Sequence, residues 1–172
     1  SLGRSFDNLI TEQTKGFVGR QFVIDELELF LSDKEYESGY FIIKGEPGIG
    51  KSALMAYLVK TNGYIHHFNI GLQNINKAHQ FLESVCAQLI SRFELDHPTW
   101  PSDAVKDGAF LNQLLAEAGN KLKGNNKLVI VVDALDEAES SGQPSRTNIF
   151  YLPPFLPSKV YIVVSTRSKH DL

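Results

Sequence analysis

Apolar residues recur at three- and four-residue intervals in several stretches of the chain, the spacing that places side chains on one face of an α-helix. The strongest of these stretches runs from Lys77 to Phe93, and similar patterns cover Arg20 to Ser32 and Phe110 to Leu122. A further helix is expected from Ser52 to Lys60, because a glycine-rich turn precedes it and the stop signal Thr61-Asn62-Gly63 follows it. The pattern therefore predicts four helices.

Between these helices lie short runs of β-branched and aromatic residues that are apolar at nearly every position. They span Gly39 to Lys44, Tyr64 to Phe68, Leu128 to Asp133 and Val160 to Val164. Strands that are apolar throughout, rather than at alternate positions, are typical of a parallel sheet with helices on both faces. The order α, β, α, β, α, α, β, β thus predicts an α/β fold built from right-handed crossovers.

The first predicted strand leads into a glycine-rich segment that matches the pattern G-x-x-x-x-G-K-[ST]. The segment reads Gly45-Glu46-Pro47-Gly48-Ile49-Gly50-Lys51-Ser52. Glycines permit backbone angles closed to other residues, so successive N–H groups can curl around a phosphate at the positive end of the helix that follows. Lys51 is then expected to reach the β- and γ-phosphates, and Ser52 to offer its hydroxyl to Mg²⁺. Ala53, the next helical residue, completes the predicted nucleotide contacts.

The alternative to a phosphate site is a glycine turn with an incidental Lys-Ser pair. Average residue usage gives such a match by chance in fewer than about 1% of chains of this length. Because the segment also lies between a predicted strand and a predicted helix, the phosphate-binding interpretation is favoured.

A second candidate site follows the third predicted strand, which ends in Asp133. Open parallel sheets bind ligands at the carboxyl ends of their strands, which is also where the phosphate-binding segment must lie. Asp133 is therefore a candidate to hold Mg²⁺ through its water shell. Asp136 and Glu137 are candidates to orient or deprotonate an attacking water. The alternative is a solvated acidic turn.

The last predicted strand is followed by Ser165-Thr166-Arg167, which places polar groups at the same edge of the sheet. Arg167 is a candidate catalytic residue that contacts a γ-phosphate. The alternative is an exposed surface arginine, because a lone arginine after a strand is common.

Charge and composition narrow the range of partners. The 172 residues carry 17 basic and 20 acidic side chains, a formal net charge of −3, so the chain lacks the basic field that drives binding to nucleic-acid phosphates. The single cysteine, Cys86, excludes an internal disulfide and favours a reducing compartment, and we expect a cytoplasmic location. No apolar run approaches the ~20 residues that cross a bilayer. Nucleic acid and membrane partners are both disfavoured.

Three segments together resemble the STAND class of P-loop NTPases, and within it the NACHT family: Gly45–Ser52, Val131–Glu137 and Val163–Arg167. The run Phe17-Val18-Gly19-Arg20 resembles a short motif before the first helix of this class and of AAA+ proteins, which lies near the adenine. This likeness implies that Val18, Gly19 and Arg20 contact the nucleotide. It also implies an ASCE-type P-loop NTPase fold, a three-layer sandwich with a parallel sheet in which the sensor strand lies between the phosphate-loop and acidic strands.

One departure from AAA+ proteins favours the STAND class. In typical AAA+ ATPases a catalytic glutamate occupies the place of Ala134. A small residue there, followed by Asp136 and Glu137, resembles STAND proteins more closely, and it leaves open which of the two carboxylates is the base.

The resemblance begins near Phe17, which gives the expected domain boundaries. Residues 1–16 are expected to be an N-terminal extension or a cloning scar, and residues 17–172 a nucleotide-binding domain that is incomplete at its C-terminus, truncated after the sensor strand. A fifth strand normally follows in this class. Without it the phosphate-loop strand is expected at an exposed edge of the sheet, which favours self-association.

Adenine is favoured over guanine. Guanine-specific P-loop proteins use an Asn-Lys-x-Asp element, and neither Asn76-Lys77 nor Asn126-Lys127 is followed by that aspartate. The expected function is a signalling switch that binds Mg²⁺ with ATP or ADP and hydrolyses ATP slowly in the full-length protein. The alternative is a nucleotide-gated oligomerisation scaffold with negligible hydrolysis. A nucleic-acid-directed motor is a third hypothesis, which the net charge disfavours.

Overall fold

The computed structural model describes residues 21–45, 50–69, 77–133 and 151–166. Within these ranges the elements follow one another in the predicted order. The helices are α2 (Gln21–Ser32), α3 (Lys51–Asn62), α4 (Ala78–Phe93) and α5 (Ala109–Lys121). The strands are β1 (Gly39–Lys44), β2 (Ile65–Phe68), β3 (Leu128–Asp133) and β4 (Val160–Thr166).

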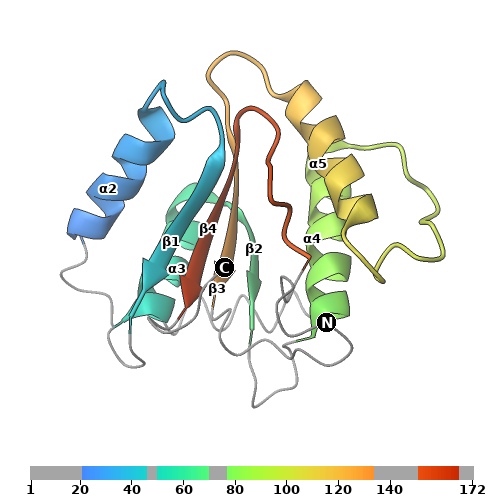
Figure 1. Ribbon diagram of the computed structural model, residues 1–172, viewed down its shortest axis with the longest axis horizontal. Coiled ribbons are helices and arrows are strands. Elements are labelled where there is room, and N and C mark those ends of the chain that lie inside the picture. The colour runs from blue at the N-terminus through green and yellow to red at the C-terminus, as the bar shows by residue number, and fades with distance from the viewer. Residues whose placement is uncertain (1–20, 46–49, 70–76, 134–150, 167–172) are drawn as a thin grey trace.

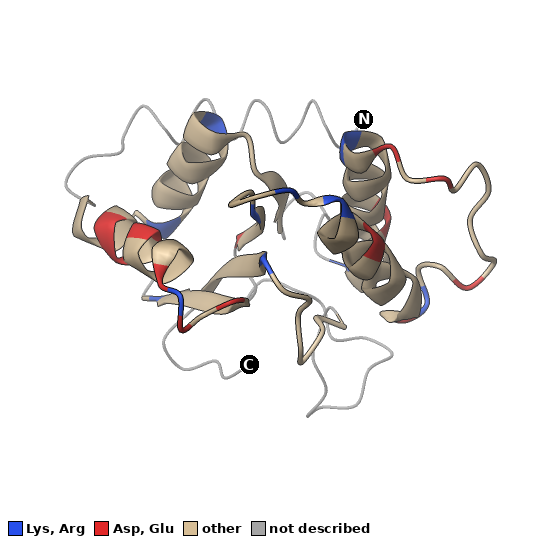
Figure 2. Ribbon diagram, turned by 90° about the horizontal axis from the view of Figure 1, so that it is seen from above, with Lys and Arg blue, Asp and Glu red and all other residues tan. Residues whose placement is uncertain are grey.

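The four strands form one parallel sheet in the order β1-β4-β3-β2. Helices α2 and α3 cover one face of this sheet, and α4 and α5 cover the other (Figures 1 and 2). The structure is therefore the predicted three-layer α/β sandwich. The sheet order also confirms that β4 lies between β1, which precedes the glycine-rich segment, and β3, which ends in Asp133.

Strand β3 explains why the central strands are apolar at every position. Leu128, Ile130 and Val132 pack into a cluster with α4 and α5, while Val129 and Val131 pack into a second cluster with α2 and α3. Both faces of the strand are buried, so neither can carry a polar stripe. Each large aliphatic side chain buried in this way contributes about 1.5–3 kcal/mol to folding. Among the described residues no helix is long and apolar enough to cross a membrane.

Two elements extend beyond their predicted ends, each for a local reason. Helix α3 continues to Asn62 because Gly63, at φ 68°, takes the left-handed conformation that ends helices and donates its N–H to the Val59 carbonyl. Strand β4 continues to Thr166 because its last two residues keep pairing with β1. Ser165 and Thr166 are therefore parts of the sheet and not loop residues.

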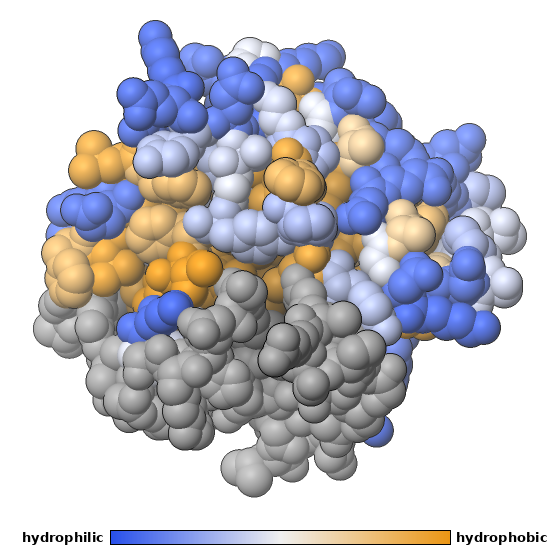
Figure 3. Space-filling view, in the orientation of Figure 1, coloured by the Kyte–Doolittle hydropathy of each residue, from blue (hydrophilic) through white to orange (hydrophobic). Residues whose placement is uncertain are grey.

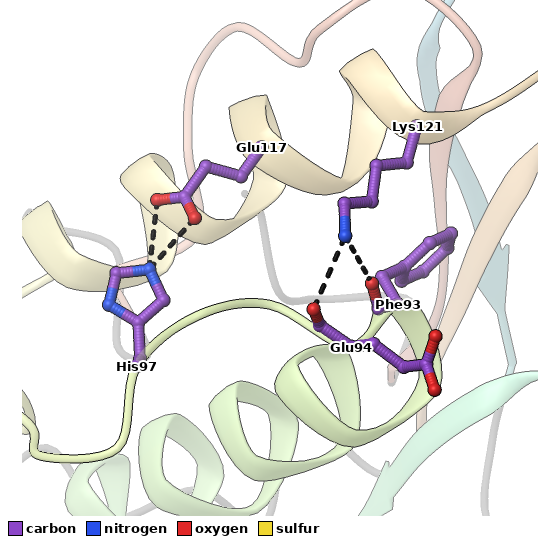
Figure 4. Close-up of polar contacts among 5 residues, drawn as sticks. All are labelled: Phe93, Glu94, His97, Glu117 and Lys121. Atoms are coloured by element: carbon purple, nitrogen blue, oxygen red, sulfur yellow. Dashed lines mark hydrogen bonds and ion pairs between the residues drawn. The ribbon is translucent and has the colours of Figure 1, made fainter.

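The linker between α4 and α5 is held by polar contacts at the surface (Figure 4). The His97 imidazole contacts the Glu117 carboxylate of α5 at 2.8 Å. The Lys121 ammonium donates to the carbonyls of Phe93 and Glu94 at 2.8 and 3.2 Å, where α4 ends. We call α4, linker residues 94–108 and α5 together the α4–α5 arm. Cys86 lies inside its core, and burial raises the pKa of the thiol to about 12.

Candidate functional site

The carboxyl ends of all four strands lie at one end of the sheet, where their arrowheads point in Figure 1. We call this region the carboxyl edge. It contains the residues that end or follow the strands, together with the start of α3: Gly45, Gly50, Lys51, Ser52, Asn69, Asp133, Ser165 and Thr166. The parallel sheet thus brings together residues that are up to about 120 positions apart in sequence, as the contact between Lys51 and Thr166 shows.

Helix α3 begins at the carboxyl edge with its first-turn amides open. Its N-cap is Gly50, whose φ of 92° is a left-handed conformation that glycine adopts at low cost. Among the described residues no side chain caps this helix end, and the Gly50 carbonyl accepts the Leu54 N–H at 3.0 Å. The N–H groups of the first turn point out of the helix, and they carry the positive end of the helix dipole.

Lys51 joins the start of α3 to the ends of two strands. Its ammonium donates to the Thr166 carbonyl at 2.9 Å and also to the Gly45 carbonyl. The Gly45 N–H donates to the same Thr166 carbonyl at 3.1 Å. An ammonium has three donors, and two of them reach these backbone oxygens. The positive charge is thereby fixed between the ends of β1 and β4.

Asp133 is the buried carboxylate of the edge, with 3% of its surface exposed. Alternate residues of a strand point to the same face of the sheet, and Val129 and Val131 pack on the face covered by α2 and α3. The Asp133 side chain therefore also extends toward α3. The Ser165 hydroxyl, on the neighbouring strand, donates to Asp133 Oδ1. The carboxylate and the start of α3 therefore face the same side of the sheet.

Asn69 approaches Asp133 from the opposite strand. The backbone N–H and the side-chain amide of Asn69 both donate to the Asp133 carbonyl, each at 3.1 Å. Two residues earlier, His67 is fully buried with its ring edge-on to Phe81 at 5.6 Å. The pKa of His67 is lowered to about 3, mainly by burial and in addition by the nearby His66, while the Asn69 side chain acts in the opposite direction. His67 is therefore neutral at physiological pH.

Sequence reasoning missed Ser165 and Asn69 as site residues. Each is a short polar residue at the end of an apolar strand, a position at which ligand sites of parallel sheets occur. Thr166 is a further member of this kind: it is fully buried, and its hydroxyl has no hydrogen-bond partner within the ranges that the structure describes.

The structure brings together six of the predicted site residues: Gly45, Gly50, Lys51, Ser52, Ala53 and Asp133. The others lie outside the described residues, and their roles stay predictions: Val18, Gly19, Arg20, Glu46, Pro47, Gly48, Ile49, Asp136, Glu137 and Arg167.

The oxygen donors of the edge fit a hard cation. The Asp133 carboxylate accepts a hydrogen bond from the Ser165 hydroxyl, and Ser52 supplies a second hydroxyl in the first turn of α3, at the same end of the sheet. Among the described residues no three His, Cys, Asp or Glu side chains come together as a metal cage. One carboxylate with hydroxyl oxygens is instead the small protein contribution that Mg²⁺ takes when water and phosphate supply its other ligands.

A groove of about 330 Å³ lies beside this edge, between α2 and β1. Its lining is mostly apolar, and Lys51 belongs to it: Phe22, Val23, Glu26, Phe41, Ile42, Ile43, Lys44, Lys51 and Leu54. An apolar groove that ends at a cationic side chain can accommodate a flat ring joined to an anionic group.

Comparisons with known proteins agree with this geometry. The family model described as Nephrocystin 3, N-terminal, matches residues 22–167. No curated protein matches the chain. Among solved structures, a Walker-type ATPase of Pyrococcus abyssi superposes with a TM-score of 0.52 at 14% sequence identity. The match covers 88% of this chain but only 46% of that protein. This structural likeness establishes the P-loop ATPase type of fold.

Proposed function

The chain belongs to the nephrocystin 3 N-terminal family, and from that premise we propose that it is a P-loop module that binds Mg²⁺ with ATP or ADP at its carboxyl edge. One observation carries the proposal. The start of α3, the Lys51 ammonium and the buried Asp133 carboxylate lie at the same end of a parallel sheet. That combination supplies amides and a cation for phosphates and a carboxylate for a metal.

Each group has a distinct part in binding. The first-turn amides of α3 donate to phosphate oxygens, and Lys51 directs an N–H toward the β- and γ-phosphates. Ser52 and Asp133 hold Mg²⁺, directly or through water, and Ser165 keeps the Asp133 carboxylate oriented. The metal, when bound, neutralises the charge that develops on the phosphates.

The groove between α2 and β1 is the proposed place for the adenine. It is apolar, adjoins Lys51, and borders the start of α2, directly after the proposed nucleotide contacts Val18, Gly19 and Arg20. A purine ring gains from apolar surface in such a groove, while Lys51 receives the phosphates. The Asn-Lys-x-Asp element for guanine is missing from the sequence, which favours adenine.

Hydrolysis is the slower part of the proposed activity. Asp136 or Glu137 would orient the attacking water, and Arg167 would contact the γ-phosphate. Because positioning and electrostatics supply most of the catalysis of phosphoryl transfer, groups outside this chain can decide its rate. We therefore propose a slow switch of the STAND type, which signals through its bound nucleotide.

The direct test is calorimetric titration of Mg²⁺-ATP, ADP and GTP into the protein and into Lys51→Ala. The variant is expected to bind adenine nucleotide about 100-fold more weakly, because a hydrogen bond to a charged group contributes about 1.5–3 kcal/mol. Lys60→Ala is the matched control, since Lys60 is exposed at the far end of the same helix. Wild-type protein that binds no nucleotide, or binds it equally after Lys51→Ala, would refute the proposal.

A second candidate function is a nucleotide-gated oligomerisation scaffold, and one surface favours it. Strand β1 pairs with β4 on one side and has no strand on its other side in the described sheet. Large side chains are exposed on β1, on α2 and in the turn between them: Phe22, Leu29, Tyr36 and Ile42. Hydrophobic surface also gathers over the side of the molecule that carries α2 and β1 in Figure 3. An open edge with apolar flanks is suited to pairing with another chain.

Light scattering with ADP and with a slowly hydrolysed ATP analogue tests the scaffold. A nucleotide-dependent change of mass is expected, and Leu29→Lys should abolish it, because the charge lies in this exposed apolar surface but outside the groove proposed for adenine. Phe155→Lys is the control: Phe155 is an apolar residue with 89% of its surface exposed that lies outside β1 and α2. The same mass in both nucleotide states would count against this candidate.

A further inference from the structure

Asn69, which directly follows β2, makes two hydrogen bonds to the same residue of the neighbouring strand. Strand β2 pairs with β3 so that Phe68 lies opposite Asp133. Asn69, one residue further, then places two donors on the single carbonyl of Asp133, its backbone N–H and its Nδ2, both at 3.1 Å. A carbonyl oxygen has two lone pairs, and Asn69 occupies both. The backbone contact alone would continue the sheet, so the side-chain contact is an addition.

The addition fixes Asp133 from both sides. On the β2 side Asn69 holds the carbonyl, and on the β4 side the Ser165 hydroxyl holds the carboxylate. Asn69 itself has little freedom to turn away, since only 3% of its surface is exposed. The peptide that leaves β3 is thereby restrained, and with it the direction of the carboxylate that extends toward α3.

Asn69 is also linked to helix α4, through the neighbouring His67. His67 is adjacent to the Asn69 side chain, which influences its pKa, and the buried His67 ring packs edge-on against Phe81 of α4. A continuous set of contacts therefore runs from α4 through His67 and Asn69 to Asp133. It reaches Asp133 from the β2 side of the sheet, whereas Lys51 contacts the end of β4 on the other side of β3.

We propose that Asn69 is a positioning residue, which sets the direction of the Asp133 carboxylate and through it the affinity of the site for Mg²⁺. The proposal rests on the proposed function, since it concerns the metal that accompanies the nucleotide. Partners that orient metal ligands without touching the metal typically change metal affinity by about 10- to 100-fold. Among the described residues Asn69 contacts Asp133 and His67, and its hydrogen bonds reach none of the phosphate-binding residues, so we expect its effect to be specific to the metal.

The test separates metal affinity from nucleotide affinity in the purified protein. Mg²⁺ is titrated into protein saturated with ADP, and ADP binding is measured separately in excess EDTA. For Asn69→Ala, and for Asn69→Leu, which has a side chain of similar size without the amide donor and without added charge, the Mg²⁺ affinity is expected to fall about 10-fold or more. Metal-free ADP affinity should stay within about twofold of the wild-type value.

Asn62 provides the matched control. Its Nδ2 also donates to a backbone carbonyl, that of Leu58 at 3.0 Å, but at the far end of α3. Asn62→Ala should leave both affinities unchanged. An unchanged Mg²⁺ affinity in folded Asn69 variants would overturn the proposal, and so would equal losses with and without metal, which would indicate a structural role only.

Two further outcomes are decisive. If both Asn69 variants fail to fold, His67→Phe, which keeps a ring against Phe81, takes their place, and a loss of Mg²⁺ affinity without loss of metal-free ADP affinity is again required. If wild-type protein binds no ADP, or Lys51→Ala leaves binding unchanged, the proposed function fails and this inference fails with it. If wild type binds and only the Asn69 prediction fails, the proposed function stands alone.

Discussion

The carboxyl edge and the α4–α5 arm belong to the same sheet structure, but they differ in how far their polar side chains are exposed to solvent. At the edge, Asn69, Asp133, Ser165 and Thr166 are all at most 3% exposed. In the arm, the side chains of His97 and Glu117 are 16% and 34% exposed, and Lys121 lies at the surface. Burying polar groups costs free energy unless each finds a partner, whereas surface pairs cost and contribute little. Natural proteins accept the buried arrangement mainly where function needs it.

The largest effect on stability is expected from the core under the arm. Leu114 is fully buried between α5 and the sheet, and Leu114→Ala should destabilise the protein by about 2–5 kcal/mol through lost burial and the cavity left behind. Urea unfolding measures this change. Nucleotide affinity of the remaining folded protein should stay at the wild-type value, because the cluster lies on the opposite face from Asp133. A loss of affinity in the folded fraction would show that the two regions are coupled.

Asp133→Asn should reverse that result, with a large effect on binding and little effect on stability. The affinity for Mg²⁺-ATP is expected to fall about 100-fold, because the metal loses its one buried carboxylate. The melting temperature should stay the same or rise, because a buried charge is replaced by a neutral group of the same shape. Calorimetry and thermal melting of one preparation give both values. A strong loss of stability would mean that Asp133 is mainly structural.

Ser165→Ala should have the same direction as Asp133→Asn but a smaller size. Its hydroxyl contributes about 1 kcal/mol by donating to Asp133 Oδ1, so Mg²⁺ affinity should fall about fivefold. Ser84→Ala is the matched control, because the Ser84 hydroxyl accepts a hydrogen bond from Gln88 at 3.0 Å on α4. Equal effects of the two serine variants on Mg²⁺ affinity would contradict a special role for the edge.

The helices and strands could be predicted from the sequence more completely than the residues that make up the candidate site. Strand β1 has its predicted bounds, Gly39 to Lys44, because adjacent residues carry the signal for a buried strand. The start of α3 was also predictable, since Gly50 and Lys51 belong to a pattern with fixed spacing. Such local signals need no knowledge of which strands become neighbours.

Asn69 and Ser165 could not be predicted in the same way. Their partner, Asp133, lies 64 and 32 positions away, respectively. Only the order of the strands and their register bring these residues together, and a single polar residue after a short strand is otherwise indistinguishable from a loop residue. The residues that orient a site are thus specified by topology, whereas the residues that bind phosphate are specified by a local motif.

The smallest effect is expected from the hydrogen bond between His97 and Glu117 in the arm. The hydrogen bond from His97 holds the pKa of Glu117 below its ordinary value of 4.5, so the contact contributes stability above pH 4.5 that is lost as the pH falls through the lowered pKa. Because Glu117 is about one-third exposed, the contribution should be below about 0.5 kcal/mol. Urea unfolding of wild type and Glu117→Gln across the range from pH 7 to pH 3 should show a small difference at pH 7 that decreases as the pH falls. A difference of several kcal/mol would instead place the arm, like the carboxyl edge, among the regions where polar contacts determine how the protein works.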